Sequence, residues 1–141
     1  MNKKLFNFII FGCFGIAAEV FFTATVNFIH EIQQNLPHDY RLIGKSYIWM
    51  FFIYGAASML FPPFYRLVSR HHLVVRLFFY GCGIFIVEFI SGFLLEKITG
   101  VCPWHYTSGV NILGYIRLDY LPVWMFFGWL MERFYLIINK Y

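Results

Sequence analysis

The stretch Leu77–Leu95, LFFYGCGIFIVEFISGFLL, decides the fold of this chain, because it is almost wholly apolar and carries a single charge, Glu88. A helix needs about 20 mostly apolar residues to cross the hydrocarbon core of a bilayer. Lipid offers the backbone no hydrogen bonds, so a crossing segment must satisfy its own, as a helix does. The stretch therefore predicts a transmembrane helix, which we expect over 74–96.

Three further runs have the same character. They lie at 5–29, 47–67 and 121–139, and none of them carries more than two charged residues. The chain lacks the alternating ten-residue pattern that is typical of transmembrane strands. The sequence thus predicts an all-α polytopic membrane protein, with four transmembrane helices in a bundle and residues 1–141 forming a single integral membrane domain.

The composition excludes other classes of protein. Of the 141 residues, 60% are hydrophobic and 13% are charged, whereas soluble domains average roughly 45–50% apolar and ~25% charged residues. Nineteen Phe, ten Tyr and four Trp also exclude a disordered chain, which lacks the apolar surface to collapse. The apolar run at 5–29 is longer than a signal-peptide core, so we expect it to be a span and not a cleaved leader.

The distribution of Lys and Arg predicts the topology, because these residues accumulate on the cytoplasmic side of short connections. One set of membrane edges carries seven of them: Lys3, Lys4, Arg66, Arg70, Arg76, Arg133 and Lys140. The other set carries four: Arg41, Lys45, Lys97 and Arg117. We expect both termini to be cytoplasmic in a multi-pass protein of the cell (plasma) membrane. The net charge of +4 then reflects the membrane topology. We therefore expect no nucleic-acid partner.

Three Glu residues lie inside predicted spans, where a lipid-facing charge costs at least ~2.5 kcal/mol. They should therefore face the bundle interior, and hydroxyl-bearing residues share the faces on which they lie. The candidate polar pocket comprises Glu19, Thr23, Tyr54, Ser58, Glu88 and Glu132. Around the first carboxyl, a small and polar stripe includes Gly12, Gly15, Glu19, Thr23, Asn27 and His30. The alternative is that these groups only hold the helices together.

The segment 102–120, between the third and fourth predicted helices, is long for a connector, which has a median of ~4–6 residues in compact domains. We expect it to fold as an outer cap, with Trp104 packed on the first and third helices and Arg117 paired with Glu88 or Asp119. The candidate cap residues are Cys102, Trp104, His105, Tyr106, Asn111, Arg117 and Asp119. An interfacial belt of aromatic side chains is the alternative.

Other kinds of site have little support in the sequence. The three cysteines include no close pair, so neither a disulfide framework nor a zinc site is indicated. A nucleophilic pair formed by Cys102 and His105 remains an alternative. The chain has no Gly-rich phosphate loop, and we predict no metal and no cofactor.

Several motifs occur in an order that resembles a known family. They are Glu19 to Ala24, Trp49 to Gly55, Glu88-Phe89 with Gly92-Phe93, Cys102-Pro103-Trp104 with Tyr106, and Gly114 to Asp119 leading to Trp124 and Glu132. This chain resembles the bacterial ABC-transporter type IV (CmpB-like) integral membrane family, whose vertebrate relatives are the transmembrane protein 229 family. The resemblance implies a multi-spanning protein of the permease type. His105 stands where many relatives have Asp.

Three functional hypotheses follow. The first is a transport (permease-like) component in which Glu19 and Glu88 bind a cation or proton. The second is a small intramembrane enzyme acting on a lipid or lipid-like substrate at the outer leaflet, with Glu19 or Glu88 as base near Cys102, His105 or Arg117. The third is a structural or assembly subunit of a membrane complex. Four spans can form a transport pathway only in an oligomer. In the lipid bilayer we therefore expect either a homo-oligomer or a complex with membrane or ATPase partner subunits.

Overall fold

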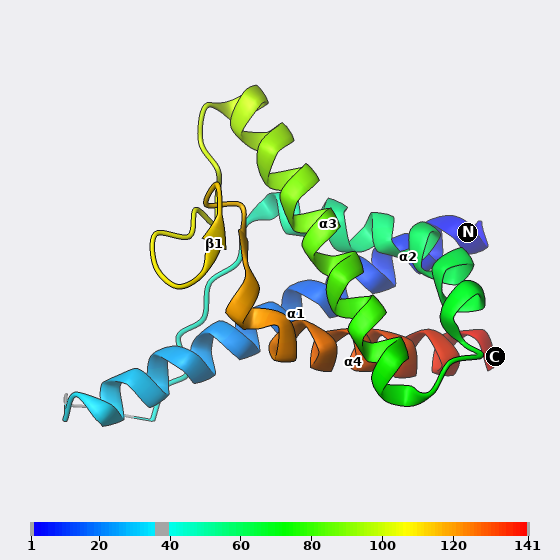
Figure 1. The fold of residues 1–141 in the computed structure, drawn as a ribbon, viewed down its shortest axis with the longest axis horizontal. Helices are drawn as coiled ribbons and strands as arrows, with labels where there is room; N and C mark the ends of the chain where they lie inside the picture. Colours follow the sequence, from blue (N-terminus) through cyan, green and yellow to red (C-terminus); the bar gives the residue numbers. More distant parts are fainter. Residues whose placement is uncertain (1, 36–39, 141) are drawn as a thin grey trace. The chain divides into compact units, whose positions relative to one another are not determined.

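The structure is a computed structural model that describes residues 2–35 and 40–140. It contains four long helices, α1 (Lys3–Gln33), α2 (Ile48–Val68), α3 (Leu73–Thr99) and α4 (Leu121–Lys140), which Figure 1 shows in order along the chain. Each is long and apolar enough to cross a membrane. The all-α class is confirmed, and the chain is a multi-pass membrane protein. The helix ends lie within four residues of those predicted. The cytoplasmic placement of the termini stays a prediction.

Local chemistry explains several features of these helices. α1 begins after Asn2, whose side chain accepts a hydrogen bond from the backbone N–H of Lys4. α2 contains Pro62 and Pro63 in its interior, and each proline removes one backbone hydrogen bond of the helix. The chain divides into two compact units at this point, residues 1–61 and residues 62–141.

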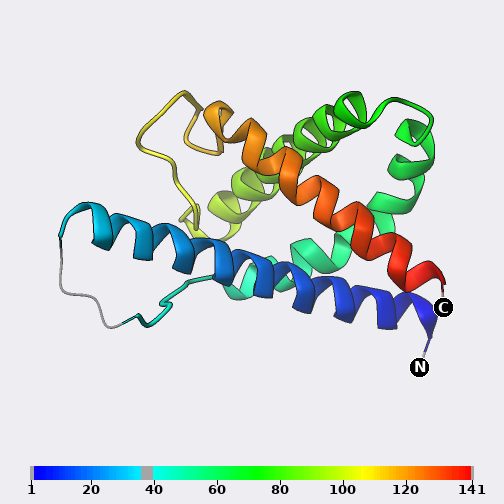
Figure 2. The ribbon, with the colours of Figure 1, turned by 90° about the horizontal axis from the view of Figure 1, so that it is seen from below.

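Unit 1 comprises α1, the segment that follows it and the part of α2 before Pro62. The two helices contact each other through aromatic rings, with Phe8 meeting Phe51 edge to face at 6.0 Å between centroids. Phe11 and Ala24 of α1 are buried, as is Met50 of α2. Residues 41–47 form neither helix nor strand and run beside α1, as Figure 2 shows.

Unit 2 comprises the end of α2, then α3, the α3–α4 connection and α4. α3 and α4 cross (Figure 1), and the crossing is close because Gly128 of α4 faces the side chain of Tyr80. The end of α2 adds two ring contacts, Phe64 with Tyr80 and Tyr65 with Tyr135. The helices of this unit therefore share one packed core, in which Tyr80 and Glu132 are buried.

The α3–α4 connection is folded, as the sequence predicts. Its strands β1 (Asn111–Ile112) and β2 (Ile116–Arg117) pair antiparallel, and a short helical turn, η1 (Leu118–Tyr120), leads into α4. This small ribbon is an addition to the expected all-helical structure. It is closed by a backbone hydrogen bond from Leu118 N–H to the carbonyl of Val110, at 2.7 Å.

Candidate functional site

An extended segment, residues 43–46, lies along α1 and is held there by polar side chains of that helix. We call this segment the strap. The Asn27 side-chain amide donates to the carbonyl of Ile43 at 3.1 Å. The Thr23 hydroxyl accepts from the backbone N–H of Lys45 at 3.0 Å and donates to its carbonyl. Part of the polar stripe predicted on the first helix thus binds the neighbouring connection.

The strap lies so close to α1 that one of its residues must be glycine. A Cβ atom built on Gly44 would lie 2.0 Å from the carbonyl oxygen of Val20. Van der Waals contact between carbon and oxygen needs more than 3 Å, so a side chain here would push the strap off the helix. This close contact brings Ser46, two residues after Gly44, within hydrogen-bonding distance of Glu19.

Glu19, near the middle of α1, accepts two hydrogen bonds on the same oxygen. The hydroxyls of Ser46 and Tyr54 each donate to Oε2 at 3.0 Å. The ring of Tyr54 reaches the carboxylate because it lies over Gly15, one helical turn earlier, where any Cβ would overlap the ring. Tyr54 and Thr23, which the sequence predicts as pocket residues, therefore lie close to Glu19. Ser46 also contacts Glu19, although the sequence did not predict it as a pocket residue.

Glu132 is the second carboxylate that is bound by neighbouring side chains, and it lies in unit 2. The side chain is only 2% exposed. Arg76 forms an ion pair with it, with Nε 2.7 Å from Oε2, and donates a further bond to Oε1 at 3.0 Å. The Tyr80 hydroxyl donates to Oε2 at 2.6 Å. Both carboxylate oxygens are thus engaged, and the negative charge is neutralised within the unit.

The two carboxylates share one local design. Each follows a glycine by four residues on its helix, Gly15 before Glu19 and Gly128 before Glu132, and a tyrosine of the neighbouring helix lies over that glycine and donates to the carboxylate. They differ in their charged partner. Arg76 neutralises Glu132. Among residues 2–35 and 40–140, no Lys, Arg or His forms an ion pair with Glu19.

Glu88 belongs to neither arrangement. Its Oε1 accepts a hydrogen bond from the hydroxyl of Tyr106, at 3.1 Å, which links α3 to the connection. Glu88 lies twelve residues beyond Arg76 on α3, which is about 18 Å along the helix. The structure therefore separates Glu88 from Glu132. A pocket shared by Glu88 and Glu19 stays a prediction, because these residues belong to different units.

Ser58, the remaining member of the candidate pocket, is buried on α2. The donors to Glu19 are Ser46 and Tyr54, so Ser58 is not part of that hydrogen-bond cluster. Two hollows among the described residues are lined by apolar side chains. One of about 570 Å³ in unit 1 is open and lies beside α1 and the strap, and one of about 320 Å³ in unit 2 lies between α3 and the ribbon.

The α3–α4 connection is docked on the last turns of α3. A Cβ atom built on Gly92 would lie only 3.2 to 3.4 Å from the side chains of Tyr115, Cys102 and Trp104, so these three side chains cover the glycine closely. The indole N–H of Trp104 donates to the carbonyl of Tyr115, and the Tyr115 hydroxyl donates to Glu96 at 2.5 Å. That hydrogen bond raises the pKa of Tyr115 above its usual range. Trp104 is half-buried against α3, and a contact with α1 stays a prediction.

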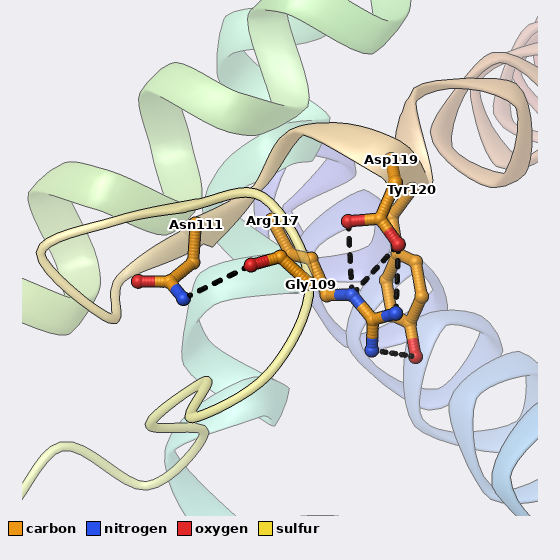
Figure 3. Close-up of polar contacts among 5 residues, drawn as sticks. All are labelled: Gly109, Asn111, Arg117, Asp119 and Tyr120. Carbon is orange, nitrogen blue, oxygen red and sulfur yellow. Dashed lines mark hydrogen bonds and ion pairs between the residues drawn. The ribbon is translucent and has the colours of Figure 1, made fainter.

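Arg117 pairs with Asp119 and not with Glu88, which were the two partners expected. Figure 3 shows its guanidinium facing the Asp119 carboxylate, with N–O distances of 2.7 to 2.9 Å. The same guanidinium donates to the Tyr120 hydroxyl and lies 4.4 Å from the centre of that ring. The hydrogen bonds to Asp119 raise the pKa of Arg117 above its usual value. This cluster ties β2 to η1.

The remaining cap candidates have structural contacts. Asn111 donates to the carbonyl of Gly109 (Figure 3) and accepts from the backbone N–H of Gly114. The exposed His105 ring packs over Gly114. Cys102 is buried, and burial raises the pKa of its thiol, although the backbone N–H of Trp104 acts in the opposite direction. Within the described parts of the chain, no hydrogen bond joins the Cys102 thiol to His105.

Three side chains that bind Glu19 or Glu132 were not predicted from the sequence: Ser46, Arg76 and Tyr80. Ser46 lies in a connection, where no periodicity marks a functional side chain. Arg76 lies at the start of α3, where the sequence pattern indicates only the membrane topology. Comparing the depths of charged residues on antiparallel helices would have matched Arg76 with Glu132.

The fold and these clusters define a multi-pass membrane protein whose intramembrane carboxylates are each held by the hydroxyl of a tyrosine. Those tyrosines are Tyr54 for Glu19, Tyr80 for Glu132 and Tyr106 for Glu88. No protein-family model and no solved structure matches the chain.

Proposed function

We propose that this protein is a transport (permease-like) membrane component that binds a small cation or a proton at Glu19. The observation that carries the proposal is the contrast between its two similar carboxylates. Glu132 is neutralised by Arg76, whereas Glu19 has two hydroxyl partners and no cationic partner among the residues described. A carboxylate in the middle of a span is costly as an isolated charge. A bound cation or proton removes that cost at Glu19, as Arg76 does at Glu132.

The surroundings of Glu19 favour a hard cation over a soft one. Ser46 and Tyr54 contribute hydroxyl oxygens. One turn further along α1, Thr23 and the carbonyl of Lys45 add two more oxygens. Oxygen ligands suit alkali and alkaline-earth cations. Both hydroxyls donate to Oε2, so Oε1 accepts no bond from the described residues and remains the acceptor for the incoming cation or proton.

Ligand-dependent stability tests the proposal. Purified protein in phosphatidylcholine nanodiscs is unfolded thermally while NaCl or KCl replaces choline chloride at constant ionic strength, and in a second series while the pH is varied. We expect one of these three probes to stabilise the native protein, by about 2.7 kcal/mol at a hundredfold excess over Kd. Glu19→Gln should abolish that response, because the amide has no charge to neutralise.

Matched variants separate binding from folding. Glu132→Gln should lower the stability in every condition but keep the dependence on cation or pH. Tyr54→Phe should weaken the dependence without abolishing it. The proposal is wrong if Glu19→Gln responds to Na⁺, K⁺ and pH as the native protein does. Flux of the same probe into proteoliposomes, present in the native protein and absent in Glu19→Gln, would establish transport.

A structural or assembly role is the second candidate, and the Glu132 cluster favours it. This carboxylate is fully engaged by Arg76 and Tyr80 and buried within unit 2. If Glu19→Gln changes only the stability of the protein, then Glu19 is structural as well, and the assembly role is favoured for the protein as a whole. The enzymatic alternative has less support, because Arg117 already binds Asp119 and Tyr120.

We also propose membership of the ABC-transporter type IV (CmpB-like) family. Supporting this, the Cys102-Pro103-Trp104 motif behaves as one packed element, with Trp104 and Cys102 both against Gly92 of α3. A structure of a family member tests the assignment: its Cys-Pro-Trp turn should pack on a glycine of the third helix. A motif exposed to solvent there would count against membership.

A further inference from the structure

We propose that the turn between α2 and α3 binds the headgroup of an anionic phospholipid through Arg66 and Arg70. Both arginines are exposed, as are the neighbouring His71 and His72. Neither arginine forms an ion pair within residues 2–35 and 40–140. The inference rests on the surface of unit 2 alone and is independent of the function proposed for Glu19.

No carboxylate described in unit 2 is available to these arginines. Glu88 and Glu96 lie in the second half of α3, away from the turn, and Asp119 lies in η1 beyond the far end of that helix. Glu132 lies nearer to the turn, but Arg76 and Tyr80 occupy both of its oxygens. No carboxylate side chain described in unit 2 therefore neutralises the positive charge of the turn, which leaves it available to an anion from outside the unit.

The turn is held in one shape, so its charges are presented together. The backbone N–H of Ser69 donates to the carbonyl of Tyr65 at 2.8 Å, and the Ser69 hydroxyl donates to the carbonyl of Arg66 at 3.3 Å. The backbone N–H of His71 donates to the carbonyl of Val68 at 3.0 Å. Such a fixed turn loses little conformational entropy when it binds a ligand.

The residues that flank the turn favour a lipid over a soluble protein. Leu67, which lies between the two arginines in sequence, is 73% exposed, and Val74, which follows the turn, is 70% exposed. The complementary ligand therefore carries a negative group next to an apolar one. A phospholipid with an anionic headgroup has this form, and basic residues next to a span attract such lipids.

Native mass spectrometry of the purified full chain tests the proposal by titrating phosphatidylglycerol, phosphatidylcholine or inorganic phosphate. We expect phosphatidylglycerol to bind more tightly than phosphatidylcholine. Each Arg→Gln change should weaken its binding by about fivefold, which corresponds to ~1 kcal/mol for each basic residue near an anionic surface. The variant R66Q/R70Q should therefore lose about 25-fold.

Two further variants make the result specific. R66K/R70K keeps both charges and should retain most of the binding. Lys97→Gln removes an exposed cation at the other end of α3 and should change nothing. The proposal is overturned if R66Q/R70Q binds phosphatidylglycerol as the native protein does, or if phosphatidylcholine binds equally well. It is also overturned if inorganic phosphate displaces the lipid at similar concentration, which would identify a free-anion site, or if only a protein ligand depends on the two arginines.

Discussion

At the scale of single residues, Glu19 and Glu132 differ in how strongly each carboxylate is bound. Glu132 is ion-paired and buried, so Glu132→Gln leaves the charge of Arg76 uncompensated. Breaking a buried ion pair costs about 3–5 kcal/mol. Glu19 accepts two hydroxyl bonds, and Glu19→Gln should cost only about 0.5–1.5 kcal/mol for each bond weakened. Chemical denaturation in mixed micelles compares the two variants.

A double substitution controls this prediction. Replacing Arg76 by Met together with Glu132 by Leu removes both charges and should recover most of the stability that Glu132→Gln loses. Equal losses in Glu132→Gln and Glu19→Gln would contradict the difference in binding that we infer. Tyr80→Phe, which removes only one bond to Glu132, should lie between the native protein and Glu132→Gln.

Cys102 gives a pH-dependent prediction at the same scale. Burial raises the pKa of its thiol, and the nearby carboxylates Glu96 and Glu88 raise it further. The folded state therefore holds the proton more tightly than the unfolded chain. The resulting stability is fully present below the pKa of an ordinary thiol and is lost as the pH rises through the higher pKa of the folded state.

Alkylation by iodoacetamide measures this shift, because the thiolate is the reactive form. In a variant that has Cys102 as its one cysteine, we expect the rate to rise at higher pH in the folded protein than in the same protein unfolded in SDS. Coincident pH profiles in the two states would show that the thiol is not shielded by the packing on Gly92.

At the scale of elements, the strap depends on its contact with α1. In Gly44→Ala, the new Cβ would overlap the carbonyl of Val20, so the strap must move away from the helix. We expect a loss of about 1–3 kcal/mol, as for other overpacked positions. The backbone N–H of Lys45, which donates to Thr23, should then exchange with solvent much faster.

Hydrogen exchange followed by mass spectrometry checks the strap directly. Gly83→Ala on α3 is the control, because its Cβ would meet only the ring of Phe64, at 3.1 Å. This control should leave exchange at Lys45 unchanged. If exchange at Lys45 is the same in Gly44→Ala as in the native protein, the strap does not need its close contact with α1.

At the scale of the whole molecule, the distribution of Lys and Arg predicts which ends of the spans are cytoplasmic. A reporter fused after Ser69, in the basic turn, should be cytoplasmic, and one fused after Thr107, in the α3–α4 connection, should be external. Paired fusions to alkaline phosphatase, active outside the cytoplasm, and to green fluorescent protein, fluorescent inside it, measure both positions. An external Ser69 with an internal Thr107 would overturn the topology.

The sequence by itself determined the class of the fold. Apolar runs such as Leu77–Leu95 must become helices in lipid, because only local hydrogen bonds can satisfy their backbone. The partnership of Arg117 with Asp119 was also among the expectations, since the two residues are close in the chain. In each of these cases the physical cause lies within one segment of sequence.

The tertiary structure alone decided the partners of the intramembrane carboxylates. Arg76 meets Glu132 across 56 residues of sequence, and Ser46 meets Glu19 across 27. Helical periodicity shows which face of a helix is polar, but it does not show which neighbour covers that face. Gly15, Gly44 and Gly128 let Tyr54, the strap and Tyr80 approach closely. This packing makes Glu132 one half of an ion pair, whereas the partners of Glu19 among the described residues are the hydroxyls of Ser46 and Tyr54.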